Sequence, residues 1–374
     1  MPTTQTRPPS KVYFTNLSTR QGKSLPQKLQ HLIKKAGIGK IDFDGKFVAV
    51  KLHFGEMGNL AYLRPNYAKA LCDHIKTLGA KPFVTDCNTL YVGSRKNALD
   101  HLDCAYENGY NPFATGVHTI IADGLKGTDE VLVPVENGEY VTHAKIGTAI
   151  MDADIFISLN HFKGHEMAGF GGAIKNIGMG SGSRAGKMEM HSSGKPHVDQ
   201  SLCIGCRKCA QICAHDAVAI ENKLASIEED VCKGCGRCIG ACPKDAVCPA
   251  SDEANDIMNY KMAEYSKAVL SGREHFHINL VIDISPFCDC HSKNDVPIVP
   301  DVGFFASFDP VALDRACADA VNRQTPHAGS LLEHAPDAHS DHFCNLFPGT
   351  NWETQLTHSE KLGIGTEKYT LIEC

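Results

Sequence analysis

Residues 47–86 read FVAVKLHFGEMGNLAYLRPNYAKALCDHIKTLGAKPFVTD, and this segment sets the architecture of the chain. Its two ends, residues 47–52 and 82–86, are short apolar and β-branched runs of the kind that form buried strands. Four apolar residues recur between them at helical spacing: Tyr67, Leu71, Ile75 and Leu78. Pro65 stands where this helix would begin, and Gly79 stands where it would end. The segment therefore predicts a β-α-β unit and a parallel pair of strands.

Further strand-like runs follow along the chain, over residues 117–121, 155–159, 278–284 and 298–305. Helices are expected over residues 97–108 and 258–270, and another is expected to begin at Pro310 with Asp309 as its N-cap. A hairpin is expected around Asn137 and Gly138, and an edge strand at residues 369–372. Together these elements predict an α/β fold with a mostly parallel sheet and flanking helices.

Eight of the 17 cysteines form two runs with the same spacing. The runs are Cys203-x2-Cys206-x2-Cys209-x3-Cys213 and Cys232-x2-Cys235-x2-Cys238-x3-Cys242. This spacing is typical of bacterial ferredoxins that hold two 4Fe-4S clusters, in which the fourth cysteine of each run binds the other cluster. The first cluster is therefore expected to bind Cys203, Cys206, Cys209 and Cys242, and the second Cys232, Cys235, Cys238 and Cys213. A pair of zinc sites is the alternative, but zinc usually takes ligands from two separated cysteine pairs.

The strands before and after the cysteine runs look like parts of one sheet, so the ferredoxin is expected to be an insert. The expected boundaries are a disordered tail at residues 1–10, a first part of the α/β domain at 11–193, the two-cluster ferredoxin insert, a small α+β domain, at 194–250, and the second part with a C-terminal tail at 251–374.

Composition restricts the class of protein. The chain has 374 residues, a formal charge of -6 and a sequence pI of about 6.3. No basic surface is therefore predicted for nucleic acid or an anionic membrane. No apolar run approaches the roughly 20 residues that span a bilayer, and residues 1–37 lack the apolar stretch of a signal peptide. We expect a cytoplasmic protein, and exposed 4Fe-4S clusters would suit anaerobic conditions.

A second informative segment, residues 158–180, follows a predicted strand with histidines, lysines and a glycine-rich turn. His161, Lys163, His165 and Lys175 are the candidate catalytic residues, because histidine and lysine can exchange protons and bind anions. Gly169, Gly171, Gly172 and Asn176 are candidate cofactor-binding residues, since glycines let backbone N–H groups and a helix N-terminus approach an anion. The spacing matches no dinucleotide or Walker motif.

Two further groups are expected at the same strand ends. Asp86 and Asn88 follow the strand at residues 82–86 and are candidate cofactor-binding residues, although capping of a turn is the alternative. Cys288 and Cys290 follow the strand at residues 278–284 and suit a metal or a redox thiol pair, with buried unreactive thiols as the alternative.

At this point the chain resembles the family called domain of unknown function 362. The resemblance rests on residues 160–180, residues 85–91 with Arg95 and His101, the Cys288-Asp289-Cys290 segment, and residues 307–314. It implies an iron–sulfur protein with an α/β domain, and it implies no catalytic residue set.

The function expected from the sequence is an iron–sulfur oxidoreductase. Electrons from a ferredoxin-like or other redox partner protein would pass through two 4Fe-4S clusters to a small-molecule substrate, or to a second cofactor such as flavin, in the α/β domain. One alternative is an electron-transfer subunit of a larger complex. Another is a metal-handling or maturation protein that binds an additional metal at Cys288 and Cys290.

Overall fold

The computed structural model describes residues 8–191, 195–249, 254–335 and 341–374. Residues 1–7 of the expected tail lie outside the described residues, and Ser10 already begins the first strand. Sixteen strands occur in the described part of the chain, and eight of them form one sheet in the order β16-β1-β15-β14-β7-β2-β3-β4. The strands of this sheet are β1 Ser10–Thr15, β2 Phe47–Lys51, β3 Lys81–Asp86, β4 Thr119–Ile121, β7 Ile155–His161, β14 Glu274–Val281, β15 Gly303–Ser307 and β16 Tyr369–Glu373.

The sheet is mostly parallel, as the sequence predicts. Strands β14, β7, β2, β3 and β4 run in one direction, and β1 pairs in parallel with β16. Only β15 is antiparallel to both of its neighbours, β1 and β14. The sheet therefore presents the carboxyl ends of five adjacent parallel strands at one edge.

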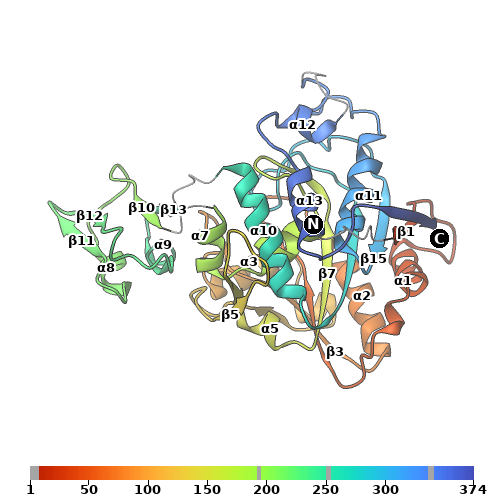
Figure 1. Cartoon of the computed structure of the whole chain (residues 1–374), viewed down its shortest axis with the longest axis horizontal. Coiled ribbons are helices and arrows are strands. Elements are labelled where there is room, and N and C mark those ends of the chain that lie inside the picture. Colours follow the sequence, from red (N-terminus) through yellow and green to blue (C-terminus); the bar gives the residue numbers. More distant parts are fainter. Residues whose placement is uncertain (1–7, 192–194, 250–253, 336–340) are drawn as a thin grey trace, which may run out of the picture.

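Helices cover both faces of the sheet, as Figure 1 shows. Helices α1 (Leu25–Ala36) and α2 (Pro65–Thr77) bury their apolar sides on one face. Helices α6 (Ala173–Ser181), α10 (Asn255–Leu270) and α11 (Pro310–Asn322) cover the other face. The remaining longer helices are α3 Ala98–Glu107, α7 Arg184–His191 and α13 Glu353–Lys361. The short ones are Ile38–Lys40 (3-10), α4 Pro112–Thr115, α5 Thr148–Asp152 and α12 His342–Leu346.

Local signals explain where several elements begin. The Asp309 side chain accepts hydrogen bonds from the N–H groups of Val311 and Ala312, which confirms the expected cap of α11. Asn97 caps α3 in the same way. The expected hairpin is formed by β5 (Glu130–Pro134) and β6 (His143–Gly147). A second small hairpin, β8 (Lys163–His165) with β9 (Gly169–Gly171), follows β7 directly.

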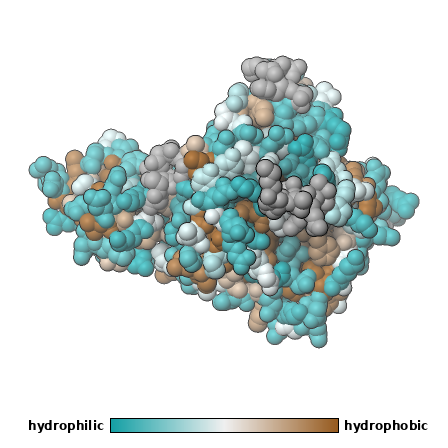
Figure 2. Space-filling view, in the orientation of Figure 1, coloured by the Kyte–Doolittle hydropathy of each residue, from teal (hydrophilic) through white to brown (hydrophobic). Residues whose placement is uncertain are grey.

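Residues 195–249 form a separate cysteine-rich lobe beside α7 (Figure 1). Its ends are joined by an antiparallel pair of strands, β10 (Pro196–Val198) and β13 (Val247–Pro249). Between them lie a hairpin of β11 (Val218–Glu221) and β12 (Leu224–Ile227) and two short helices, α8 (Lys208–Ile212) and α9 (Arg237–Ala241). Figure 2 shows this lobe protruding from the rest of the molecule, with small apolar patches among polar residues. In the described parts of the chain, none of the helices combines the length and the apolar character needed to cross a membrane.

Candidate active site

A pocket of about 230 Å³ opens at the carboxyl ends of β2, β3, β7 and β14. Because these strands are parallel, their ends meet at the edge where open α/β sheets bind ligands. The residues that follow each strand line it: His53 after β2, Asp86 at the end of β3, His161 at the end of β7, and Cys288 and Cys290 after β14. The segments that the sequence analysis assigned to one crevice thus lie together.

The pocket wall carries more positive than negative side chains. The cationic ones are Lys51, Arg95, Lys163, Lys175 and Lys187, and the carboxylates are Asp86 and Glu166. Three of the cations have carboxylate partners: Lys51 lies 2.9 Å from Asp86, Arg95 lies 2.9 Å from Glu56, and Lys163 lies 3.9 Å from Asp289. The surplus of positive charge in a buried wall favours an anionic ligand.

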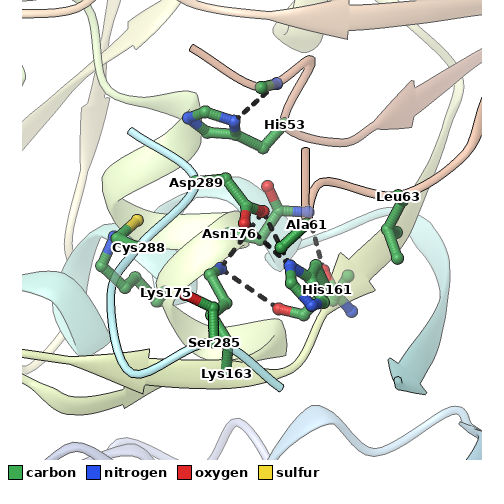
Figure 3. Close-up of polar contacts among 12 residues, drawn as sticks. His53, Ala61, Leu63, His161, Lys163, Lys175, Asn176, Ser285, Cys288 and Asp289 are labelled. Carbon is green, nitrogen blue, oxygen red and sulfur yellow. Dashed lines mark hydrogen bonds and ion pairs between the residues drawn. The ribbon is translucent and has the colours of Figure 1, made fainter. Parts of the chain in front are cut away.

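His161 is held on both sides of its ring (Figure 3). Its Nδ1 lies 2.8 Å from Asp289 Oδ1, and its Nε2 lies 2.8 Å from the carbonyl oxygen of Ile282. Lys163 completes this group, with Nζ donating to the His161 carbonyl at 3.1 Å and lying 3.9 Å from Asp289 Oδ2. Burial raises the pKa of a carboxyl group, but His161 and Lys163 outweigh it and hold the pKa of Asp289 at about 2. His161 therefore positions the loop after β14 and has no free ring nitrogen for the expected proton transfer.

His165 presents a ring nitrogen to the pocket. Its Nδ1 accepts hydrogen bonds from the N–H groups of Met167 (3.1 Å) and Ala168 (3.0 Å), so the proton of the neutral ring is on Nε2. Burial lowers the pKa of His165 well below its usual value. Beside it, Glu166 lies 2.6 Å from His291, and the two form an ion pair at the rim. His165 is therefore a neutral hydrogen-bond donor at pH 7.

Cys288 and Cys290 lie in the pocket next to Lys175. The Lys175 ammonium is 3.5 Å from Cys288 Sγ, and the two thiols hydrogen-bond to each other. Burial lowers the pKa of Lys175, but Cys288 and Cys290 more than offset this, and its pKa is raised. The hydrogen bond from Cys288 lowers the pKa of Cys290 to about 7, whereas the bond to Cys290 and burial raise the pKa of Cys288 well above 9.0. The pair thus shares one proton.

We expect alkylation of Cys290 by iodoacetamide to speed up with pH around a midpoint of about 7, since only the thiolate reacts. The charged and titratable groups that face it are Cys288, Lys175, Glu166 and Arg95. The Lys175→Gln variant should move the midpoint upward, because the ammonium stabilises the thiolate. The check is peptide-resolved mass spectrometry across a pH series. A midpoint near 9 in the unaltered chain would contradict this description.

Several predicted site residues lie away from the pocket. Asn88 donates to Asp123 Oδ1 (2.8 Å) and to the carbonyl of Gly124, so it holds a loop. Gly169, Gly171 and Gly172 do not contribute to the pocket lining among the described residues.

The N-terminus of α6, the expected anion site, is filled by the protein itself. Asp314 of α11 accepts hydrogen bonds from the N–H groups of Ala173 (2.7 Å) and Ile174 (2.9 Å). A side chain on Gly172 would overlap this carboxylate. The glycine is therefore needed for close packing of α6 against α11, and Asp314 already occupies the N–H groups of Ala173 and Ile174 that were expected to bind an anion.

Asn176 and Asp86 line the pocket, but both are committed to Lys51. The Lys51 ammonium donates to Asn176 Oδ1 at 2.7 Å and lies 2.9 Å from Asp86 Oδ1. Pocket residues that were not predicted from the sequence include Lys51, Lys187 and His191. The spacing of Lys187 and His191, four residues apart in α7, is a signal that would place both on one helix face.

The cysteine-rich lobe contains two small cavities. The cysteines that line the first cavity are Cys203, Cys206, Cys209 and Cys242. The cysteines that line the second are Cys213, Cys232, Cys235 and Cys238. Each cavity thus takes three cysteines from one run and the last cysteine of the other run.

The lobe packs against the α/β domain through α9. Leu90 and Met188 belong to the apolar core that also contains Cys238 and Ile239. Leu90 lines the pocket as well, and so does Tyr91, whose hydroxyl lies 2.9 Å from His191 Nδ1. Lys96 forms an ion pair with Asp245 across the same boundary. Side chains at the base of the lobe are therefore continuous with the pocket wall.

The family model described as domain of unknown function (DUF362) matches residues 48–319. The chain belongs to the DUF362 family. The match includes the strands that end at the pocket, the cysteine-rich lobe and the Cys288-Asp289-Cys290 loop.

No curated protein matches the DUF362 chain. Among solved structures, it is similar to the lactate racemase apoprotein from Thermoanaerobacterium thermosaccharolyticum, with 12% identity, a TM-score of 0.41, and coverage of 73% of this chain and 51% of that one. It is also similar to a protein from Thermotoga maritima, with 13% identity, a TM-score of 0.37, and coverage of 71% and 52%. The chain spans about half the length of these two proteins.

No three His, Cys, Asp or Glu side chains within the described ranges converge to hold one metal ion. His161 offers no further ligand for a metal at Cys288 and Cys290, because its ring nitrogens contact Asp289 and the Ile282 carbonyl. Cubane binding differs from single-ion binding, because each thiolate binds a different iron atom and the four sulfur atoms stay apart around the cavity.

Proposed function

We propose that this chain is an iron–sulfur oxidoreductase. Residues 194–250 bind two 4Fe-4S clusters, and single electrons pass from a redox partner protein through them to a small anionic molecule in the pocket. One observation carries the proposal: eight cysteines surround two cavities in two sets of four, next to a pocket lined by lysines, histidines and two more cysteines.

The residues around the two cavities fit cubane clusters. Backbone N–H groups point at sulfur atoms of both sets at 3.3–3.4 Å: Ala217 to Cys213, Ala225 to Cys203 and Gly234 to Cys232. Such contacts stabilise thiolates that bind iron. Each cluster, when bound, accepts and releases one electron.

Arg184 gives independent support for a negative charge in the lobe. Its side chain is fully buried, and its Nε and Nη1 atoms have no hydrogen-bond partner among the described residues. It lies against Gly236 and Gly240 of the α9 segment. Cys235 and Cys238 are close enough that their thiolates would raise the pKa of Arg184. Asp123 supplies part of the counter-charge to this buried guanidinium, and a thiolate-bound cluster in the second cavity would supply more.

Exposure supports a direction for electron flow. Cys206 is exposed, and the neighbouring Ile204 side chain is 59% exposed, so a partner protein can reach the first cavity. Cys209 of the first cavity and Cys238 of the second are both buried in the core that contains Leu90 and Met188, but it is the second cavity whose Cys235 and Cys238 lie near Arg184 of the α/β domain. Electrons therefore enter at the first cavity and leave from the second toward the pocket.

The pocket residues divide the remaining tasks. Lys163 and Lys175 flank Gly171 and supply positive charge for the ligand. His165 donates a hydrogen bond from Nε2, and the Lys175 ammonium is the group that can deliver a proton to a reduced ligand or thiol. The aromatic and apolar residues between the lobe and the pocket keep water out of the path.

The test is anaerobic reoxidation of the dithionite-reduced protein by anionic acceptors, namely a 2-oxo acid, an unsaturated dicarboxylate and a carboxylated disulfide. We expect Lys163→Gln to raise the acceptor concentration for half-maximal rate by roughly tenfold to a hundredfold, as loss of one charge-assisted hydrogen bond predicts. Iron content should be unchanged. Lys126→Gln, at an exposed lysine outside the pocket, is the matched control.

If none of the three acceptors increases the rate of reoxidation, or if the rate is the same in Lys163→Gln, the pocket is not the acceptor site. That outcome would favour an electron-transfer subunit.

A further inference from the structure

The loop after β14 holds two thiols in a fixed position at the pocket. Three contacts fix its backbone or side chains: the Glu56 N–H donates to the Asp289 carbonyl (2.9 Å), the His291 N–H donates to the Cys288 carbonyl (3.1 Å), and the Asp289 carboxylate holds His161 (2.8 Å). Both Cys288 and Cys290 line the pocket. Neither thiol belongs to the apolar core clusters of described residues that contain Cys72 of α2 and Cys317 of α11.

The two thiols are neighbours in the wall of the pocket. The thiols already hydrogen-bond to each other. One residue separates them, so their Cα atoms are at most about 7 Å apart, close to the span of a disulfide. A disulfide in so short a loop is strained and easily reduced, which is the property of catalytic disulfides.

The two thiols differ in the way that a nucleophile and a resolving thiol differ. Cys290 is partly exposed and its pKa is lowered to about 7, while Cys288 is 1% exposed and keeps its proton. The pKa of each of the buried cysteines Cys72, Cys87 and Cys317 is raised by burial. Among these buried or half-buried thiols, Cys290 is the one prepared to attack at neutral pH.

We propose that Cys288 and Cys290 are a redox-active pair that reduces small anionic disulfides. This inference rests on the proposed function and names its substrate class. The Cys290 thiolate attacks one sulfur of the substrate disulfide, forms a mixed disulfide and expels one thiolate. Cys288 then loses its proton, attacks Cys290 Sγ and expels the second thiolate, which leaves a Cys288–Cys290 disulfide.

Two electrons and two protons restore the pair, so the sum is RSSR + 2e⁻ + 2H⁺ → 2RSH. The electrons come from a one-electron donor protein by way of the lobe. Two clusters that each carry one electron together supply the two electrons that reduce one disulfide. Lys175, 3.5 Å from Cys288 Sγ, returns the proton to that sulfur. The lysines of the wall select a carboxylated disulfide over a cationic one.

The first test is a redox titration of the anaerobically purified chain in dithiothreitol buffers, followed by acid quenching and alkylation. Peptide mass spectrometry should show reversible, simultaneous loss of alkylation at Cys288 and Cys290, with Cys317 alkylated throughout. Iron and sulfide are measured in the same samples. Independent oxidation of the two residues, or none, would overturn the proposed pair.

The second test uses Cys288→Ser, which cannot resolve a mixed disulfide. We expect Cys290 in this variant to retain half of dithiodiglycolate, and to react about tenfold faster with it than with the cationic cystamine, as attraction to the positive wall requires. Equal rates for the two probes would refute the substrate class. Should the variant fail to fold, the titration of the unaltered chain still decides.

A third measurement separates this inference from the proposed function. The oxidised chain is reduced by photoreduced deazaflavin, and cluster bleaching and thiol content are followed together. Clusters that reduce while the disulfide persists would reject the pair and leave the oxidoreductase standing. A disulfide that forms in a chain without iron would reject the oxidoreductase instead.

Discussion

The Cys238→Ser variant is expected to bind about four iron atoms per chain where the unaltered protein binds about eight. Cys238 is buried in the second cavity, and a serine oxygen is a poor ligand for iron in a cubane. Cys238 does not line the first cavity, so the cluster in that cavity should persist. Anaerobic iron and sulfide determination, with paramagnetic resonance of the reduced protein, measures both.

Each cavity takes its fourth cysteine from the other run of the sequence, and a second variant tests this grouping. Cys213→Ser should remove the same cluster as Cys238→Ser, although Cys213 belongs to the other run of the sequence. Cys248→Ser is the matched control, since Cys248 lies in β13 with its thiol bonded to the Asp245 carbonyl at 3.2 Å. Loss of the first cluster in Cys213→Ser would contradict the grouping of the cysteines.

The Asp86→Ala variant is expected to lower the free energy of unfolding by about 3–5 kcal/mol, the usual cost of leaving one partner of a buried ion pair alone. Lys51 and Asp86 are almost completely buried and lie 2.9 Å apart. Burial raises the pKa of Asp86, but Lys51 and His101 outweigh it and the pKa is lowered. The contribution of Asp86 is therefore present above its unfolded pKa and is lost as the pH falls.

Chemical denaturation of the α/β domain measures this loss. Asp42→Ala is the matched control, because Asp42 also lies 2.9 Å from a lysine but on the surface, and we expect little change there. The double variant Lys51→Met with Asp86→Leu should recover much of the stability, because no buried charge remains alone. A small effect of Asp86→Ala would mean that water reaches this pair.

The sequence predicted the elements whose signals are local. The runs at residues 47–52, 82–86 and 155–159 became neighbouring strands, and Asp309 caps its helix as expected. Strand β1 and helix α1 were missed, and β15 begins later than its apolar run suggested. Pairing of β1 with β15 and β16 joins residues about 290–360 positions apart, and no local pattern reports such contacts.

In the site too, some features could be predicted from local sequence, and others depend on residues far away in the chain. The location of the pocket could be predicted, because open α/β sheets bind ligands at the carboxyl ends of their parallel strands. The roles of single residues depended on partners elsewhere in the chain. Asp314 fills the helix N-terminus that the glycine pattern suggested for an anion, and Asp289 binds the ring of His161. Neither partner could be inferred from the segments that contain Gly172 or His161.

Iron and acid-labile sulfide per chain, measured on protein purified without oxygen, decide whether residues 194–250 bind two 4Fe-4S clusters. We expect about eight of each, with a broad visible absorbance that bleaches on reduction and a paramagnetic signal from the reduced clusters. Zinc in place of iron, or iron without sulfide, would contradict it.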